Sequence, residues 1–147
     1  MTARLEALRA LKAKVEAGEW ADITKALRSP PGDFCEGFQF APMDRRSRLA
    51  WSTYHGSLDA AKALHKAVLP GWFWRISECH LSSDAWVGPD FNCPTHGARL
   101  LDTVPQTING QDWHEFTDVD LRPAGNPARA LLISDLLALI ALEEAKQ

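Results

Sequence analysis

The sequence predicts an α+β fold in which helices pack on a small, mostly antiparallel sheet, with an N-terminal helical extension. Three observations support this class: an amphipathic segment leads into an alternating aromatic strand at 58–77, an Asn-Gly turn lies at 109–110, and a nearly all-apolar helix begins at 126–127. The 147 residues are 46% hydrophobic and 24% charged, which is typical of one globular domain covering 1–147.

The first 30 residues predict two helices that form the extension. Apolar side chains recur at helical spacing up to Gly18, namely Leu5, Leu8, Leu11 and Val15. A second short helix is predicted over 20–27 and ends before Pro30-Pro31-Gly32. Because so narrow an apolar stripe cannot form a core alone, we expect the extension to dock on a core at 50–147.

Residues 33–53 lack a clear period and predict an irregular segment followed by a basic loop. The loop carries Arg45, Arg46 and Arg48, and Trp51 and Tyr54 follow it. Arginines beside aromatic rings can bind phosphates while the rings stack on bases. A solvated basic loop without a ligand is the alternative, because charged residues mostly lie at the surface.

The 58–77 segment predicts a helix followed by a strand. Ser57 is a good N-cap, and Pro70-Gly71 ends the helix. Small and aliphatic residues at 60, 61, 63, 64, 67 and 68 share one arc of the helix. The opposite arc, expected to face solvent, carries Asp59, Lys62, His65 and Lys66. One face of the strand carries Trp72, Trp74 and Ile76.

The rest of the chain predicts a sheet closed by one long helix. Strands are expected at 72–80 and 84–88, a loop at 88–103, and a type I′ hairpin over 104–119 around Asn109-Gly110. Asn126-Pro127 begins the last helix, whose polar residues up to Leu142 do not share a face: Arg129, Ser134 and Asp135. Such a helix is buried within the domain or also faces a second subunit, and we predict a two-fold dimer through it.

Potential metal ligands are present, but their spacing is wrong for a metal site. Two cysteines and two histidines match the ligand types of tetrahedral zinc: Cys79, His80, Cys93 and His96. Adjacent residues of a strand point to opposite faces, and no Cys-x-x-Cys pair exists. We therefore predict no metal and no cofactor.

No catalytic residues are predicted. The chain lacks Gly-x-Ser-x-Gly, paired-carboxylate and phosphate-loop motifs. Asp112-Trp113-His114-Glu115 is the nearest polar cluster, and Asp112 and His114 would share one face of a strand. Solvated hairpin residues account for this pattern better than catalysis, because strand faces away from the core are normally polar.

Charge and hydropathy limit the partners and the location. The formal net charge of −3 gives no global attraction to nucleic acid or to an anionic membrane. The start of the chain lacks the apolar core of a signal peptide, and the longest apolar run, 136–142, is far short of the ~20 residues that span a bilayer. Three irregularly spaced cysteines do not predict a disulfide framework, so a cytoplasmic location is expected.

Two motifs lie in the expected core region. One is Ser57-Leu58-Asp59-Ala60-Ala61 with the tryptophan-bearing strand through Trp74, and the other is Asn126-Pro127-Ala128-Arg129-Ala130-Leu131 with the helix after it. Together they resemble the phage ABA sandwich domain family over roughly 50–145. The resemblance implies a small phage or prophage protein with a layered α+β fold, and it supplies no catalytic or binding residues. The chain departs from the family before Trp51 and has a longer insert at 88–103.

The function expected from the sequence is that of a non-enzymatic phage accessory protein in the host cytoplasm. It would sequester a small anionic or nucleotide ligand, or block a host protein. Two places could supply its ligand-binding residues. The first is the arginine loop with its aromatic neighbours, Arg45, Arg46, Arg48, Trp51 and Tyr54, and the second is the strand face that carries Arg75, with Arg122 or Arg129 near the start of the last helix. One alternative is a nucleic-acid binder, since the helix–three strands–helix order is similar to that of the double-stranded RNA-binding domain. The other is an enzyme of unrecognised type.

Overall fold

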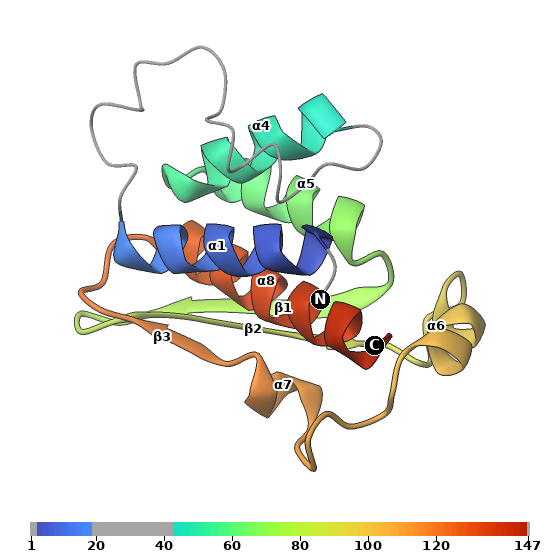
Figure 1. Cartoon of the computed structure of the whole chain (residues 1–147). Coiled ribbons are helices and arrows are strands. Elements are labelled where there is room, and N and C mark those ends of the chain that lie inside the picture. The colour runs from blue at the N-terminus through green and yellow to red at the C-terminus, as the bar shows by residue number, and fades with distance from the viewer. Residues whose placement is uncertain (1–2, 19–42, 147) are drawn as a thin grey trace.

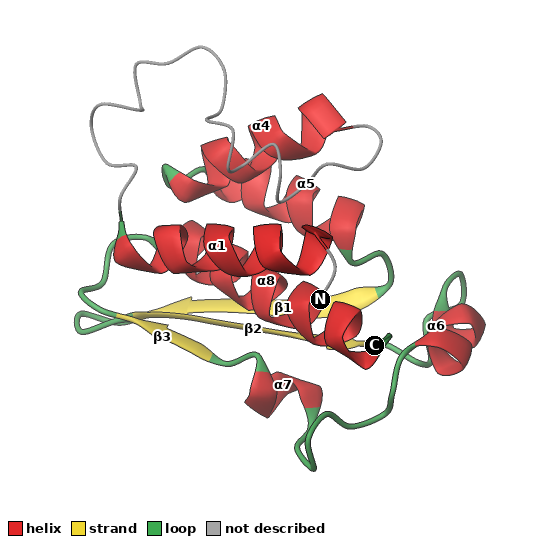
Figure 2. Cartoon of the chain, in the orientation of Figure 1, coloured by secondary structure: helices red, strands yellow, loops and turns green. Residues whose placement is uncertain are grey.

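A computed structural model of the chain describes residues 3–18 and 43–146, except the side chains of 43–45 and 47 (Figure 1). Six helices and three strands lie within these ranges, which confirms the predicted α+β class (Figure 2). In chain order they are α1 (Ala3–Ala17), α4 (Met43–Tyr54), α5 (Leu58–Val68), β1 (Trp72–Glu78), β2 (Ser83–Pro89), α6 (Gly97–Thr103), α7 (Trp113–Phe116), β3 (Val119–Leu121) and α8 (Pro127–Ala145). The helix predicted over 20–27 lies outside the described residues.

The sheet is antiparallel and has the order β1-β2-β3. Its register places Trp74 opposite Val87, and Ile76 opposite Ala85, so the predicted apolar face of β1 continues across β2. α8 lies against this face, α1 and α5 pack on α8, and α4 packs on α5 and α8 (Figure 1). The core therefore lies between one face of the sheet and the helices.

The two predicted helix starts are confirmed. The Ser57 hydroxyl accepts a hydrogen bond from the Ala60 amide at 3.1 Å, at the start of α5. The Asn126 side chain accepts one from the Arg129 amide at 2.9 Å, and a proline follows this cap in the first turn of α8. Each cap satisfies an amide that has no partner inside the helix.

Helix α8 is buried within a single chain. Between Ala128 and Ala141, every side chain except Arg129 and Leu137 is buried. The sheet covers one side of the helix, and α1, α4 and α5 cover the other sides. Its all-round apolar surface is thus explained without a second subunit, and the reason for predicting a dimer through this helix no longer holds.

The predicted 104–119 hairpin is wrong. Asn109 and Gly110 do adopt positive φ angles of 51° and 79°, but only an isolated bridge joins Ile108 to Gln111. The chain then forms α7, and the third strand is β3. Burial of Trp113 explains the difference: its indole N–H donates to the Pro105 carbonyl at 2.8 Å, and the side chain is 3% exposed.

Three further expectations are corrected. The predicted basic loop is part of α4, which buries Ala50, Thr53 and Tyr54 against the rest of the molecule. The predicted loop over 88–103 contains α6, whose Leu100 is buried. On α5 the predicted solvent-facing His65 is buried instead, because α8 and β1 both supply polar partners for its imidazole. Helical spacing locates a face, but it does not specify which neighbour covers that face.

Candidate functional site

A cavity of about 450 Å³ lies between α6 and the C-terminal end of α8. The first turn of α1 and the connection from α5 to β1 complete its walls. The beginning of α1 and the end of α8 lie side by side there, because Arg4 forms an ion pair with Glu143 at 2.7 Å (Figure 1). The volume falls within the range of small-molecule sites in proteins.

The walls of the cavity are mainly aliphatic. Six such side chains come from three parts of the chain that are distant in the sequence: Val68, Leu69, Leu100, Val104, Leu139 and Leu142. Trp72 also contributes, but it is 7% exposed, and its ring packs edge-on against Trp113 with centroids 5.0 Å apart. The apolar surface that a ligand can contact is thus mostly aliphatic and not aromatic.

The polar part of the cavity carries more positive than negative charge. Arg4, Arg99 and Lys146 line it, and Glu143 is the one carboxylate among the described lining residues. Glu143 is 7% exposed and receives both Arg4 at 2.7 Å and Lys146 at 3.1 Å. Among the described residues, Arg99 forms no ion pair. A locally basic site therefore exists on a chain whose formal net charge is −3.

Glycine at position 71 brings the α6 wall close to the sheet. Gly71 has a φ of +85°, and a Cβ there would lie 2.5 Å from the Cβ of His96. The carbonyl of Gly71 also accepts a hydrogen bond from the Asp90 amide at 3.2 Å. The loop that leads to α6 is thus held against the start of β1, and His96 becomes part of the cavity wall.

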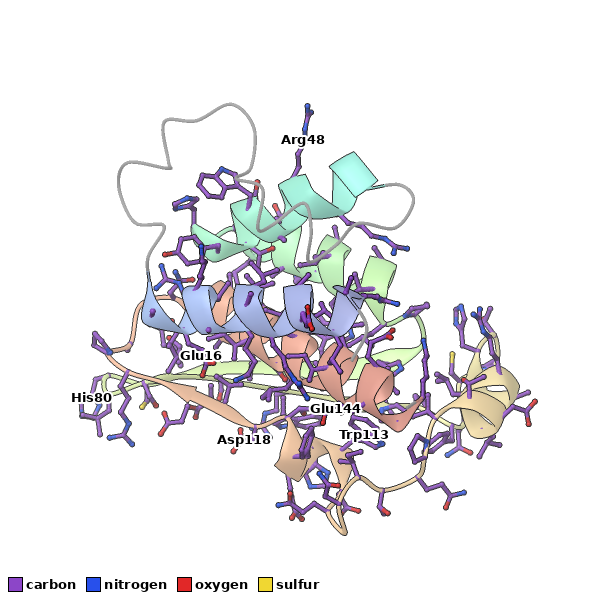
Figure 3. All side chains as sticks on the ribbon, in the orientation of Figure 1. Glu16, Arg48, His80, Trp113, Asp118 and Glu144 are labelled. Atoms are coloured by element: carbon purple, nitrogen blue, oxygen red, sulfur yellow. The ribbon has the colours of Figure 1, made fainter. Side chains whose placement is uncertain are left out.

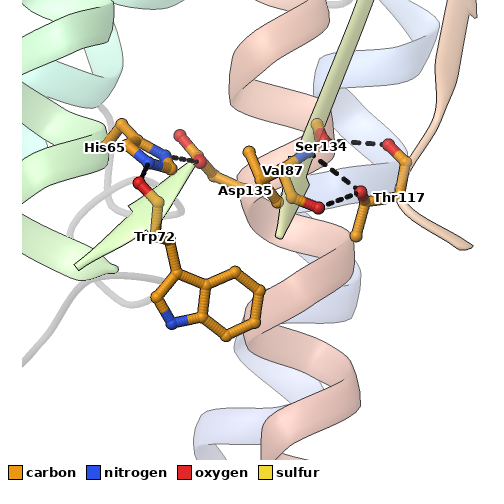
Figure 4. Close-up of polar contacts among 6 residues, drawn as sticks. All are labelled: His65, Trp72, Val87, Thr117, Ser134 and Asp135. Carbon is orange, nitrogen blue, oxygen red and sulfur yellow. Dashed lines mark hydrogen bonds and ion pairs between the residues drawn. The ribbon is translucent and has the colours of Figure 1, made fainter. Parts of the chain in front are cut away.

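A buried polar pair lies one helical turn before the cavity residues Leu69 and Leu139. The His65 Nδ1 and Asp135 Oδ1 atoms are 2.7 Å apart, and His65 Nε2–H donates to the Trp72 carbonyl at 3.0 Å (Figure 4). Both side chains are 1% exposed. Within the described part of the chain, Asp135 Oδ2 has no hydrogen-bond partner.

The environment makes this pair retain a proton. Burial alone would lower the pKa of His65, but the hydrogen bond and charge of Asp135, with the Trp72 carbonyl, outweigh it and raise that pKa. Burial raises the pKa of Asp135, against the opposing effect of His65. Both shifts favour a proton held within the pair. The contacts of this buried pair join α5, β1 and α8.

A second polar network fixes α7 and β2 to α8. The Thr117 hydroxyl accepts from the Val87 amide at 3.0 Å, and the Ser134 hydroxyl donates to the Thr117 carbonyl at 2.8 Å (Figure 4). These contacts lie in the core and not at the cavity.

The arginines predicted to form one site have different environments. The side chain of Arg45 lies outside the described residues. Arg48 is exposed and points away from the body of the molecule (Figure 3). Arg46 is half-buried and donates to the Ala67 carbonyl at 3.4 Å. Burial, and then the charge of Arg4, lower the pKa of Arg46.

The other predicted residues lie elsewhere. Tyr54 is fully buried, and the Arg129 guanidinium lies 4.2 Å from its ring centroid. Trp51 stacks near Tyr54 with ring centroids 6.4 Å apart, and it lies about one and a half turns along α4 from Arg46. Arg75 is exposed on β1, pairs in register with Trp86, and belongs to the sheet face opposite Trp74. Among the predicted residues whose side chains the structure describes, the arginine-loop group and Arg75 thus lie on different parts of the molecule.

The candidate metal ligands are also separated. His80 lies at one end of the sheet, whereas the loop with Cys93 and His96 lies beside α6 at the other end (Figure 3). Among the described residues, Asp112, His114 and Glu115 place ligand atoms within 4.8 Å of one another, and all three are exposed on or beside α7. Exposed groups of this kind are common without a metal and do not define a site by themselves.

Sequence patterns missed the cavity but contained a signal for the buried pair. Asp135 lies in a helix that is otherwise almost entirely apolar, and a buried carboxylate requires a buried partner. By contrast, Arg99 and Arg4 carry no local signal, because their role depends on the meeting of α1, α6 and α8.

No family model, curated protein or solved structure matches this chain. In the described part of the chain, no helix is long and apolar enough to cross a membrane. The geometry of the cavity is therefore the basis for proposing a function.

Proposed function

We propose that this protein is a non-enzymatic binding module that holds a small anionic ligand in the cavity between α6 and the end of α8. The observation that carries the proposal is the excess of cations over carboxylates around an apolar cavity in an acidic chain. Coulombic attraction favours an anion there, and the walls exclude water from the apolar part of the ligand. Arg99 is the expected main contact, because Arg4 and Lys146 already bind Glu143.

A binding role accounts for the chemistry better than catalysis. The His65–Asp135 pair is the strongest potential acid–base unit among the described residues, and it is 1% exposed. A catalytic base has to come within hydrogen-bonding distance of the substrate proton, directly or through one water. The described residues that line the cavity include no cysteine or serine nucleophile.

The biological setting remains the one expected from the family resemblance. We propose a phage or prophage accessory protein that acts in the host cytoplasm by sequestering its ligand or by blocking a host protein. Self-association would then use a surface other than the buried α8.

Nucleic-acid binding is the second candidate, because the order α5-β1-β2-β3-α8 agrees with the predicted helix–three strands–helix arrangement. It has less support, since Arg129 in the first turn of α8 contacts Tyr54 through both its guanidinium face and a 3.4 Å hydrogen bond. Binding to a short RNA duplex, measured against salt concentration, would favour this candidate.

The test is a thermal-shift screen with alkyl carboxylates, phosphate esters, and linear and cyclic nucleotides. A ligand at a hundred times its dissociation constant should stabilise the protein by about 2.7 kcal/mol. Arg99→Ala should weaken binding at least tenfold, because a charge-assisted hydrogen bond contributes about 1.5–3 kcal/mol. Arg75→Ala is the matched control, since Arg75 is an exposed arginine of the sheet outside the cavity lining. No shift with any anion, or equal effects of the two variants, would refute the proposal.

A further inference from the structure

We propose that the ligand of this cavity is an aliphatic anion, a straight-chain carboxylate of medium length, and not a nucleotide. The inference rests on the proposed function and specifies its ligand class. It follows from three properties of the lining: its hydrocarbon surface, the scarcity of groups that could recognise a base, and the separation of charge from apolar surface.

The hydrocarbon surface favours an alkyl chain. Val68, Leu69, Val104 and Leu139 line the cavity together with Leu100 and Leu142. Binding to aliphatic walls of this kind becomes more favourable with each methylene group of the ligand that is removed from water. They provide no directional contacts, so a flexible, unbranched chain fits them without a specific orientation.

A nucleobase would find little to bind in the same place. Base recognition needs an accessible aromatic face and hydrogen-bonding groups at the base edge. The Trp72 ring is 7% exposed and packs against Trp113, and His96 packs over Gly71. The Thr103 hydroxyl already donates to the Arg99 carbonyl at 2.8 Å. The lining is therefore poorly suited to stacking or to reading a base.

The charges suit a carboxylate head group. Arg99 is exposed on α6 and makes no ion pair within the described part of the chain, so its planar guanidinium can receive a carboxylate through two parallel hydrogen bonds. Lys146 is exposed at the end of α8, beside the buried Glu143. Exposed cations next to an aliphatic interior match a ligand with one charged end and one apolar end.

The decisive experiment measures affinity against chain length. Purified protein, stripped of bound lipid by extraction on a hydrophobic resin, is titrated calorimetrically with straight-chain carboxylates of about six to fourteen carbons, below their micelle concentrations. Each added methylene should tighten binding about fourfold, until the cavity of about 450 Å³ is filled. The matching alcohols should bind at least tenfold more weakly, because they lack the charge.

Two variants separate the head-group contact from the chain contact. Arg99→Ala should weaken the binding of every carboxylate by the same factor. Leu142→Ala, at a half-buried position, should weaken the binding of the longer carboxylates more than that of the shorter ones. Arg75→Ala should bind like the wild type. Circular dichroism of each variant checks that it has folded, and the chain-length series on the wild type tests the inference even if a variant does not fold.

The outcomes distinguish this inference from the proposed function. If nucleotides bind more tightly than every carboxylate, the inference is wrong and the anion-binding function stands. If affinity does not depend on chain length, or alcohols bind as well as carboxylates, the inference is also wrong. If no anion of any kind binds, both proposals fail.

Discussion

Replacing Asp135 in the buried His65–Asp135 pair should lower the free energy of unfolding, by an amount that depends on the replacement. Asp135→Asn keeps the size and shape of the side chain but removes the charge. The new amide can still donate a hydrogen bond to His65 Nδ1, since Nε2–H already donates to the Trp72 carbonyl. A charge-assisted bond of about 1.5–3 kcal/mol then becomes a neutral one of about 0.5–1.5 kcal/mol, so we expect a loss of about 1–1.5 kcal/mol near pH 6. Asp135→Ala, which leaves the buried His65 Nδ1 atom without its partner, should cost about 3–5 kcal/mol.

The pH dependence should reverse between the wild type and Asp135→Asn. In the wild type the folded pKa of His65 is raised above its ordinary value of 6.5, so the stabilisation is fully present below that pH. It is lost as the pH rises through the folded pKa, with a slope of at most about 1.4 kcal/mol per pH unit. In the variant, burial acts without the carboxylate and lowers the pKa of His65. Its stability should instead fall as the pH drops below about 6.5.

Urea unfolding between about pH 5 and pH 9 measures both effects, because the difference between two variants removes the titration of groups that they share. Asp118→Asn is the control, since Asp118 is exposed (Figure 3). It should follow the wild type at every pH. The reasoning fails if Asp135→Asn keeps the wild-type pH trend, or if Asp135→Ala costs less than about 1 kcal/mol near pH 6.

Three further changes in stability follow from the fold. Asn126→Ala should cost about 1 kcal/mol in urea unfolding by removing the cap of α8, whereas Asn126→Asp should cost little. Thr117→Val should cost about 1–3 kcal/mol in the same assay, because the buried Val87 amide loses its acceptor. A variant as stable as the wild type would contradict this. Gly71→Ala should lower the melting temperature more than Gly125→Ala, since both have positive φ but only the first meets a neighbouring side chain.

Local sequence was sufficient for the elements whose causes are local. Ser57 and Asn126 cap their helices because each hydroxyl or amide oxygen accepts from an amide three residues ahead. The alternation of Trp72, Trp74 and Ile76 specified the inner face of β1, and Asn109-Gly110 specified a turn with two positive φ angles. The α+β class follows from the same patterns, because each one is complete within a few neighbouring residues.

Tertiary structure decided the features that depend on which segments pack against one another. The position of Trp113 against Trp72 and Pro105 replaced a predicted hairpin with α7, and α8 with β1 made His65 a core residue. The candidate site is equally non-local: its cations come from α1, α6 and the end of α8, and its aliphatic walls from α5, α6 and α8. Periodicity shows which face of an element is apolar. The identity of the partner, and the space left between partners, depend on packing between residues distant in the sequence.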